Sequence, residues 1–307
     1  MLITICVITY QRPKGLERLL EGLSLLQFRQ LQPTLQVVVV DNDEAGEAFH
    51  ACNQLAPEYP WRLTSCIEPR RGISYARNRA IALASPKSDF IAFIDDDEVP
   101  DPAWLEQLLL TQIAHQADVV HGPVLPRFPA DAPAWAIRGH FFESDRYPTG
   151  HLLEAAYTNN VLLRAALVRG VEQVFQERFA LTGGEDSYFF RSLHQAGKKL
   201  VWADEAVVYE WIPKSRTTLK WILLRGYRSC LSYSLWEKEA KPALQNRLIS
   251  SAKAFAQVAY GLLTIPSALV LRKPAPVASL LRIFRGAGRM AGILGITYQE
   301  YRTIHKG

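Results

Sequence analysis

Acidic residues follow two apolar runs that have the composition of buried strands. Residues 90–94 (FIAFI) lead directly into Asp-Asp-Asp-Glu at 95–98, and residues 36–40 lead into Asp-Asn-Asp at 41–43. Ligands bind beyond the carboxyl ends of the strands of an open parallel sheet, so we expect both acidic segments at one crevice. Carboxylates on a turn suit a hard divalent cation that also binds phosphate oxygens. The pattern predicts a site for Mg²⁺ or Mn²⁺ rather than for zinc.

The alternative interpretation of residues 95–98 is a solvated acidic turn before a helix. Asp101 and Glu106 stand where acidic side chains favour a helix N-terminus. Two aspartates with one residue between them recur by chance and do not decide between the two interpretations. Four consecutive acidic residues directly after an apolar strand favour a binding site.

A second acidic pair, Glu185-Asp186, follows Gly183-Gly184 and begins a helical pattern. Glycine lets another backbone approach closely, and a carboxylate in a partly dry pocket is a stronger base. Asp186 is therefore a candidate to accept a proton. The competing interpretation makes Asp186 a helix N-cap, a position at which Asp is favoured.

The elements that must hold these side chains alternate between short apolar strands and helical patterns. Predicted strands cover residues 3–9, 36–40, 63–67, 90–94 and 119–121, and predicted helices cover residues 15–26, 73–84, 102–115 and 186–196. This alternation predicts an α/β fold, an open, mostly parallel, Rossmann-like sheet with helices on both faces, followed by a C-terminal helical region.

The charge balance divides the chain. From Lys214 to the end there are 16 Lys and Arg against three Glu, a net charge of +13, whereas residues 1–213 carry a net charge of −8. Together with the helical patterns, this predicts a first domain over residues 1–212, with halves at 1–121 and 122–212, and a basic helical region over residues 213–307. The basic region is expected to meet phosphates or anionic lipid.

An uncharged run at residues 254–271 favours lipid as the partner of this region. It is short for a membrane span and contains Pro266, so we expect an interfacial or re-entrant helix. The following segment, residues 277–295, mixes apolar residues with arginines in the manner of a basic helix on a membrane surface. The alternative is an ordinary helical subdomain that packs its apolar face on the first domain or on a second subunit.

Several protein classes lack support. The four cysteines have neither zinc-site nor disulfide spacing, and the apolar run after Met1 lacks the flanks of a signal peptide, so a reducing, cytoplasmic compartment is expected. The glycine-rich residues 286–292 have the wrong spacing for a dinucleotide loop, and no HExxH, GxSxG or P-loop motif is present. An uncharged run inside the basic region argues against nucleic acid as a partner.

Five segments together resemble a known family, the family 2 glycosyltransferases of the GT-A fold. They share the family's order and spacing over about residues 3–210, and they read ITYQRPKGLERLL, VVVVDND, EPRRGISYARNRAI, FIAFIDDDEVPDPAWL and GGEDSYFFRSLHQAG. Each block alone is weak, whereas five in register are specific. The resemblance implies that residues 1–121 form the nucleotide-binding half of the enzyme and residues 122–212 the acceptor half.

The resemblance also implies roles for individual residues. The nucleotide-binding set would be Thr9, Arg12, Asp41, Arg71, Arg77, Asn78, Asp95 and Asp96, with Asp41 accepting the uracil N–H. Asp97 would be the direct metal ligand with Asp95 beside it, and Asp186 would be the catalytic base with Glu185 beside it. Many relatives carry a further histidine ligand where this chain reads VVYEWIP, so Glu210 is the candidate to replace it.

Weaker candidates have structural alternatives of equal weight. Arginines at 216, 225 and 228 suit a diphosphate or anionic lipid as well as a solvated helix face. Asn159 and Asn160 resemble the family's sugar-facing segment, although buried Asn turns are common. Aromatic residues that could stack on a sugar also suit a core, namely Trp135, Phe141 and Phe142.

The function implied by the resemblance is an inverting, metal-dependent transfer of a sugar from a nucleoside diphosphate, a UDP-sugar first, to an acceptor hydroxyl. A glycan or lipid-linked acceptor for the cell envelope and the inner face of the membrane are expected, and an oligomer is left open. A nucleotidyltransferase would need a Gly-rich loop where this chain reads ITYQRP. A membrane-associated scaffold with a degenerate transferase domain is disfavoured by Asp95, Asp97 and Asp186.

Overall fold

The computed structural model describes residues 1–271 and 274–298, and the chain forms two compact units. Unit 1 contains residues 1–127 and 144–211. Unit 2 contains residues 128–143 and the helices that follow Ile212. Residues 128–143 thus pack with the C-terminal helices, although the sequence groups them with the acceptor half at 122–212.

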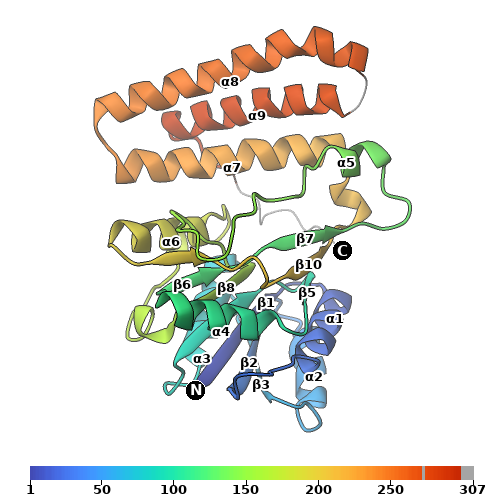
Figure 1. Ribbon diagram of the computed structural model, residues 1–307, viewed down its shortest axis with the longest axis vertical. Helices are drawn as coiled ribbons and strands as arrows, with labels where there is room; N and C mark the ends of the chain where they lie inside the picture. The colour runs from blue at the N-terminus through green and yellow to red at the C-terminus, as the bar shows by residue number, and fades with distance from the viewer. Residues whose placement is uncertain (272–273, 299–307) are drawn as a thin grey trace. The chain divides into compact units, whose positions relative to one another are not determined.

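Unit 1 is built on a seven-stranded sheet with the strand order β3-β2-β1-β4-β8-β6-β9 (Figure 1). Neighbouring strands run parallel except at β8, which is antiparallel to both β4 and β6. The prediction of an open, mostly parallel sheet is confirmed. The strands are β1 (Leu2–Thr9), β2 (Thr34–Asp41), β3 (Arg62–Ile67), β4 (Phe90–Ile94), β6 (Val119–His121), β8 (Asn160–Arg164) and β9 (Leu200–Trp202).

Helices cover both faces of this sheet because the central strands are apolar on both sides. From β1, Ile5 points into a core with Leu19 of α1, whereas Cys6 points into a core with Ala76 of α3 and Phe190 of α6. Alternate residues of a strand face opposite sides, so this division is the expected one. The helices are α1 (Pro13–Ser24), α2 (Glu47–Leu55), α3 (Ile73–Leu83), α4 (Trp104–His115) and α6 (Glu185–Gln195).

A second sheet of three short strands, in the order β5-β10-β7, lies at the carboxyl end of β4. Its strands are β5 (Glu98–Pro100), β7 (Val124–Arg127) and β10 (Val208–Trp211). The pairing of β5 with β10 is antiparallel and sets Glu210 opposite Glu98. This long-range pairing brings the segment VVYEWIP to the acidic turn. Single 3₁₀ turns occur at Ala165–Leu167, Glu177–Phe179 and Lys214–Arg216.

Unit 2 consists of the short helix α5 (Ala134–Arg138) and three long helices, α7 (Leu219–Ala240), α8 (Leu244–Leu271) and α9 (Ala275–Leu294). α9 lies between α7 and α8 and packs against both (Figure 1). At one end, an apolar cluster joins Phe142 and Ala136 to Ile222 of α7 and Leu281 of α9.

The helix α8 continues through Pro266, and a nearby hydroxyl bonds to a backbone carbonyl: Thr264 Oγ1 donates to Tyr260 O at 2.9 Å. One expectation for this region is wrong. The basic helix at residues 277–295 is not a surface helix, because as α9 it is packed between two others and buries Val277 and Leu281. Its glycines serve this packing: a Cβ on Gly286 would lie 2.7 Å from Ala254 O of α8.

Candidate active site

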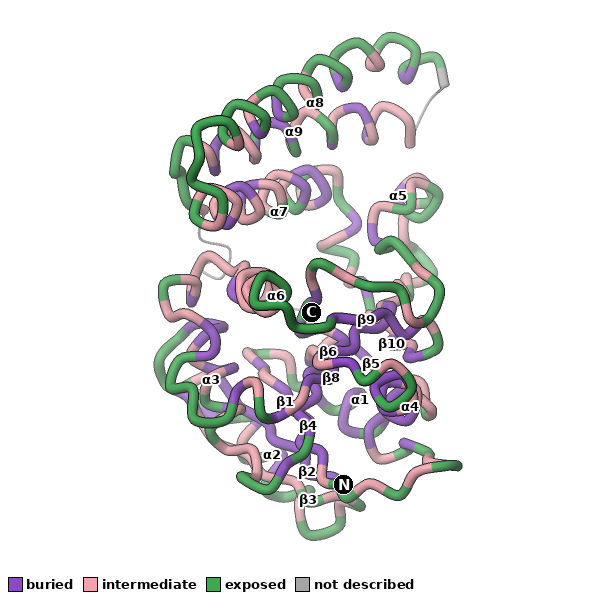
Figure 2. The backbone as a smooth tube through the Cα atoms, turned by 60° about the vertical axis from the view of Figure 1, so that its left-hand side comes forward, coloured by how far each residue is buried: buried purple, intermediate pink, exposed green. Residues whose placement is uncertain are grey.

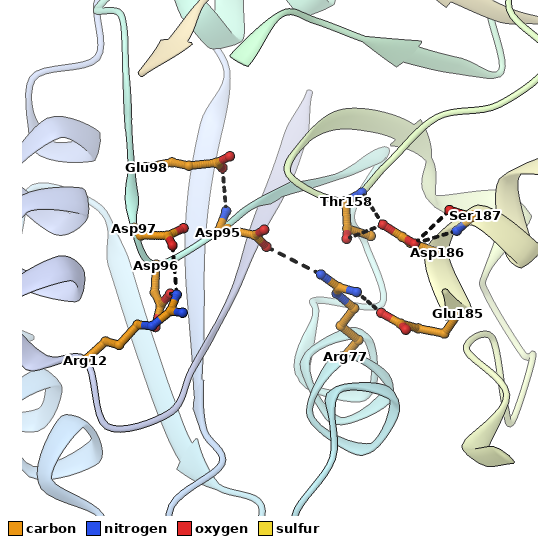
Figure 3. A network of polar contacts seen from close by, with 10 residues as sticks. All are labelled: Arg12, Arg77, Asp95, Asp96, Asp97, Glu98, Thr158, Glu185, Asp186 and Ser187. Atoms are coloured by element: carbon orange, nitrogen blue, oxygen red, sulfur yellow. Dashed lines mark hydrogen bonds and ion pairs between the residues drawn. The ribbon is translucent and has the colours of Figure 1, made fainter. Parts of the chain in front are cut away.

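The turn after β4 is held by residues from the end of β1 and the start of α1. Thr9 Oγ1 donates to Asp96 Oδ2 at 2.8 Å. Arg12 Nη1 donates to Asp96 Oδ1 and to Asp97 Oδ2, both at 2.9 Å (Figure 3). Burial raises the pKa of Asp96 to about 6, and the Arg12 guanidinium opposes that shift. Both oxygens of Asp96 are therefore engaged, which fixes the turn that carries Asp95 and Asp97.

Arg77 joins this turn to the start of α6. Its buried guanidinium forms an ion pair with Glu185 Oε1 and lies 3.4 Å from Asp95 Oδ1 (Figure 3). Burial raises the pKa of Glu185 to about 7, although the charge of Arg77 lowers it. Glu185 Oε2 is buried and has no hydrogen-bond partner within the described part of the chain. The network sets the two predicted acidic pairs on either side of one arginine.

Asp186 lies in the first turn of α6, and the N-cap position belongs to Gly184. Gly183 and Gly184 have φ values of 72° and 90°, which favour glycine and turn the chain sharply into the helix. Asp186 Oδ1 accepts the N–H of Ser187 at 2.5 Å, and Oδ2 lies 3.4 Å from Thr158 N and Oγ1. The N-cap interpretation of Asp186 is therefore wrong.

Glu210 reaches the acidic turn through the pairing of β10 with β5. The neighbouring Glu98 is buried and accepts the N–H of Asp95 through Oε2 at 2.8 Å. Burial raises the pKa of Glu98 well above its usual value, and Asp95, Asp97 and Glu210 add to the shift. Four carboxylates thus lie at one edge of the sheet, and the sequence had given Glu98 no role.

The residues at this edge fit a magnesium or manganese ion that is also bound by the oxygens of a diphosphate. Mg²⁺ is usually bound by one or two carboxylates together with substrate phosphate oxygens and waters. Asp95 and Asp97 offer two such carboxylates. Within residues 1–271 and 274–298, no group of three or more His, Cys, Asp and Glu is arranged to hold a metal by itself. Asp95 and Asp97 are thus the residues that would hold such an ion.

The remaining predicted nucleotide residues also have structural contacts. Asp41 ends β2, and its two oxygens accept the N–H groups of Asp43 at 3.0 Å and Phe49 at 3.1 Å. Asn78 exchanges two hydrogen bonds with the backbone of Phe175, at 2.7 and 2.9 Å. The Arg71 guanidinium lies 5.0 Å from the centre of the Tyr10 ring.

Sequence reasoning missed several polar residues beside Asp186. His121 is the last residue of β6. Its place at the end of a strand, like that of Asp95 after β4, could have marked it as a candidate site residue. Its Nδ1 lies 2.7 Å from Asn160 O, and burial lowers its pKa to about 4. Thr158 is separated from Asp186 by 28 residues, so no local pattern could pair them. His121 contributes a neutral ring near the candidate base.

Several of the weaker candidates have contacts within the protein that explain their positions. Asn160 is fully buried, with its amide bonded to Trp104, Pro123 and Ala206. In unit 2, Phe142 stacks on Trp221, and the guanidinium of Arg225 lies 5.2 Å from the centre of that Trp221 ring. Core packing therefore explains Phe142 without a sugar.

The sequence of this chain is similar to those of known proteins. Residues 4–170 match the family model described as glycosyl transferase family 2, more than half of the chain. The chain belongs to this family. It is 32% identical over 297 residues to the succinoglycan biosynthesis protein ExoM of Rhizobium meliloti, a match that covers 96% of this chain and 93% of the relative. A glucosyl-dolichyl phosphate glucuronosyltransferase of Haloferax volcanii is 24% identical over 249 residues, 74% of each chain.

Two solved structures share the fold. The mannosyltransferase PcManGT from Pyrobaculum calidifontis, in complex with GDP-Man and Mn²⁺, superposes with a TM-score of 0.66 at 18% identity and covers 95% of this chain and 87% of that one. TarS from S. aureus with UDP-GlcNAc gives a TM-score of 0.54 at 15% identity and covers 97% and 93%. These neighbours confirm the GT-A fold class that the five sequence blocks predicted, and this glycosyltransferase carries it in unit 1.

Proposed function

We propose that this glycosyltransferase moves a sugar, with inversion, from a nucleoside diphosphate to an acceptor hydroxyl, and that a divalent cation assists. UDP is the first candidate for the nucleoside diphosphate. The proposal is supported by the family, by the Mn²⁺ and GDP-Man of one structural neighbour and by the UDP-GlcNAc of another. The product we propose is a cell-envelope polysaccharide or a lipid-linked glycan, because the relative with 32% identity is a succinoglycan biosynthesis protein.

The observation that carries this proposal is the bridge through Arg77. It connects Asp95, on the turn with the metal-type carboxylates, to Glu185, which precedes Asp186 in α6. Inverting transfer needs a stabilised leaving group on one side of the anomeric carbon and a proton acceptor on the other. Two ion pairs of the buried Arg77 therefore connect the two predicted parts of the site.

In the proposed reaction, the acceptor oxygen forms a bond to the anomeric carbon while the bond from that carbon to the diphosphate oxygen breaks. The electron pair of the broken bond leaves with the nucleoside diphosphate. Asp186 accepts the hydroxyl proton, and Thr158 and Ser187 orient its carboxylate. A Mg²⁺ or Mn²⁺ held by Asp95 and Asp97, with Glu210 nearby, would supply positive charge to the leaving diphosphate. Glu185 fixes the guanidinium of Arg77 beside the same turn.

We further propose that the reaction takes place on the cytoplasmic face of the membrane with a lipid-linked acceptor. Two observations support a lipid-linked acceptor at a membrane. One relative is named for transfer to a dolichyl phosphate glycan, and Leu244–Val270 is a helix long and apolar enough to cross a membrane. The acceptor would then be presented at a lipid surface.

Donor hydrolysis by the purified full-length protein tests the function. We expect one donor among UDP-glucose, UDP-galactose, UDP-glucuronate, UDP-GlcNAc and GDP-mannose to be hydrolysed when Mn²⁺ or Mg²⁺ is present and to be spared in EDTA. That donor should also raise the melting temperature in the presence of metal. Proton NMR of the first product should show inverted anomeric configuration. A retained anomer contradicts inversion, and full activity in EDTA contradicts the metal.

A further inference from the structure

The outer face of α8 carries apolar residues that remain exposed among the residues that the structure describes. Leu248, Phe255, Leu262 and Leu269 are spaced seven residues apart and are 63%, 67%, 56% and 64% exposed. Seven residues are nearly two helical turns, so these side chains form one stripe along the helix. Leu263 and Val270 widen it, and Figure 2 shows most of α8 as exposed. The stripe extends over more than 20 residues.

The side of the same helix that faces α9 carries mainly small residues. Ser250, Ala254, Gly261 and Thr264 lie against α9, together with Val258 beside Gly286. Thr264 Oγ1 lies 2.9 Å from Ser279 Oγ of α9. A helix of a water-soluble bundle places its apolar stripe inward and its polar residues outward. α8 has the reverse arrangement, which is that of a helix whose outer face meets lipid.

The interior of unit 2 strengthens this reversal. Ser250 Oγ donates to Glu237 Oε2 at 2.7 Å, and Arg289 of α9 lies 3.6 Å from the same carboxylate oxygen. A largely covered, hydrogen-bonded ion pair thus lies between α7 and α9 beside Ser250 of α8. Polar groups are inside and large apolar groups are outside along most of α8.

The partner α9 decides whether α8 crosses a bilayer or lies in it. The uncharged run at 254–271 measures roughly 27 Å as a helix, marginally less than a hydrocarbon core of roughly 30 Å. α9 packs along α8 and carries Arg282, Arg285 and Arg289. A crossing α8 would draw these guanidinium groups into hydrocarbon, at high cost. With α8 in the plane of the surface, Arg282 stays at headgroup level, 5.0 Å from the exposed Tyr260 ring.

Charge selects an anionic bilayer over a second copy of the chain. The segment from Lys214 to the end has a net charge of +13, and exposed cations lie on α8 at Arg247 and Lys253 and on α9 at Arg282 and Arg285. Two such faces would repel each other in a dimer, whereas an anionic surface attracts each lysine or arginine near it.

We propose that α8 lies in the plane of an anionic bilayer, with the Leu248, Phe255, Leu262 and Leu269 stripe immersed and α9 on its aqueous side. The inference rests on the proposed membrane location and adds to it the docking element and its orientation. It does not rest on the chemistry of unit 1.

Vesicle flotation of the full-length protein tests the docking surface. We expect flotation with phosphatidylcholine–phosphatidylglycerol vesicles at low salt, much less with phosphatidylcholine alone, and a loss of at least about tenfold in the bound fraction of Phe255→Glu/Leu262→Glu. The matched control is Leu55→Glu/Ile113→Glu, which changes two exposed apolar residues of unit 1 and should float like the wild type. Circular dichroism and donor hydrolysis in solution check that the variants are folded.

Two outcomes of this experiment overturn the proposal. In one, the wild type fails to float at low salt, or the Phe255→Glu/Leu262→Glu variant floats unchanged. In the other, light scattering shows a dimer that this variant dissociates while neither protein floats, so that a second copy covers the stripe. Loss of donor hydrolysis in every protein would instead count against the proposed function.

Spin labels test the orientation separately. With Cys66 and Cys230 replaced by serine, nitroxides at positions 255, 262 and 269 should report similar immersion depths by oxygen and nickel accessibility. A steady change in depth from 255 to 269 would contradict the in-plane helix and support a crossing or re-entrant one, while the membrane location would stand.

Discussion

Unit 1 and helix α8 of unit 2 bury different kinds of side chain. Around the sheet, leucine, isoleucine and valine fill the two cores, and carboxylates gather where strands end. Along α8, serine, threonine and glycine face inward, and leucine and phenylalanine face outward. The same apolar periodicity therefore marks a core in one region and a surface in the other. An apolar stripe therefore identifies one face of a helix, and the packing around the helix decides whether that face is buried or exposed.

Removal of a strand-end carboxylate should have the largest effect, on activity alone. We expect Asp97→Ala to reduce sugar transfer by about three orders of magnitude or more, since the leaving diphosphate loses its metal. Stability should change little, because Arg12 keeps its second partner, Asp96. Transfer assays and thermal melts provide the measurements. The control is Asp145→Ala, an exposed aspartate in a loop of unit 1, and equal activity of the two variants would contradict the metal role of Asp97.

The same leucine-to-alanine substitution in each region tests the comparison directly. Leu19→Ala removes a fully buried side chain and should lower the free energy of unfolding by about 2–5 kcal/mol. Leu262→Ala, on the outer stripe of α8, should change it by less than about 0.5 kcal/mol without lipid. Urea denaturation measures both. A large loss at Leu262 would mean that this side chain belongs to a core.

The smallest effect we predict concerns pH and the buried Glu185. Its pKa is raised from 4.5 to about 7 in the fold, so between these values the folded state binds more protons than the unfolded state. Stability should therefore fall as pH rises from 5 to 7.5, by at most about 3 kcal/mol from this group. Asp96 adds a slope of the same sign in any variant that keeps it.

Glu185→Gln isolates the contribution of Glu185. The variant cannot titrate at this position, so its unfolding free energy should fall less between pH 5 and pH 7.5 than that of the wild type. Urea midpoints at the two pH values give the comparison. Identical slopes would show that Glu185 does not change its protonation in this range.

Local pattern was sufficient for the parts of the fold where neighbours in sequence decide the structure. The strands predicted at 90–94 and 119–121 match β4 and β6, and the helix predicted at 73–84 ends one residue later than α3. The helix α2 was missed because EAFHACNQL is short and buries only Ala48 and Cys52. The antiparallel β8 was missed because it lies in a stretch dominated by loops.

The sequence predicted several residues of the candidate site but not the contacts between them. Asp95, Asp97 and Asp186 stand at strand and helix ends that the sequence marks. The bridge from Arg77 to Glu185 joins residues 108 positions apart, and the approach of Glu210 to Glu98 depends on the pairing of β10 with β5. In α8, the sequence showed an apolar run but not which of its faces α9 would cover. These features depend on tertiary contacts that no local period encodes.

The most direct test of the central claim is single-turnover kinetics of Asp186→Asn, with Ser187→Ala as the matched control. Asparagine keeps the shape of the side chain and cannot accept the proton, so donor affinity should persist while the rate of transfer falls about 100-fold or more. Ser187→Ala removes one contact of the Asp186 carboxylate and should cost much less. If Asp186→Asn transfers sugar at the wild-type rate and loses only thermal stability, Asp186 is a structural residue and the proposed mechanism is wrong.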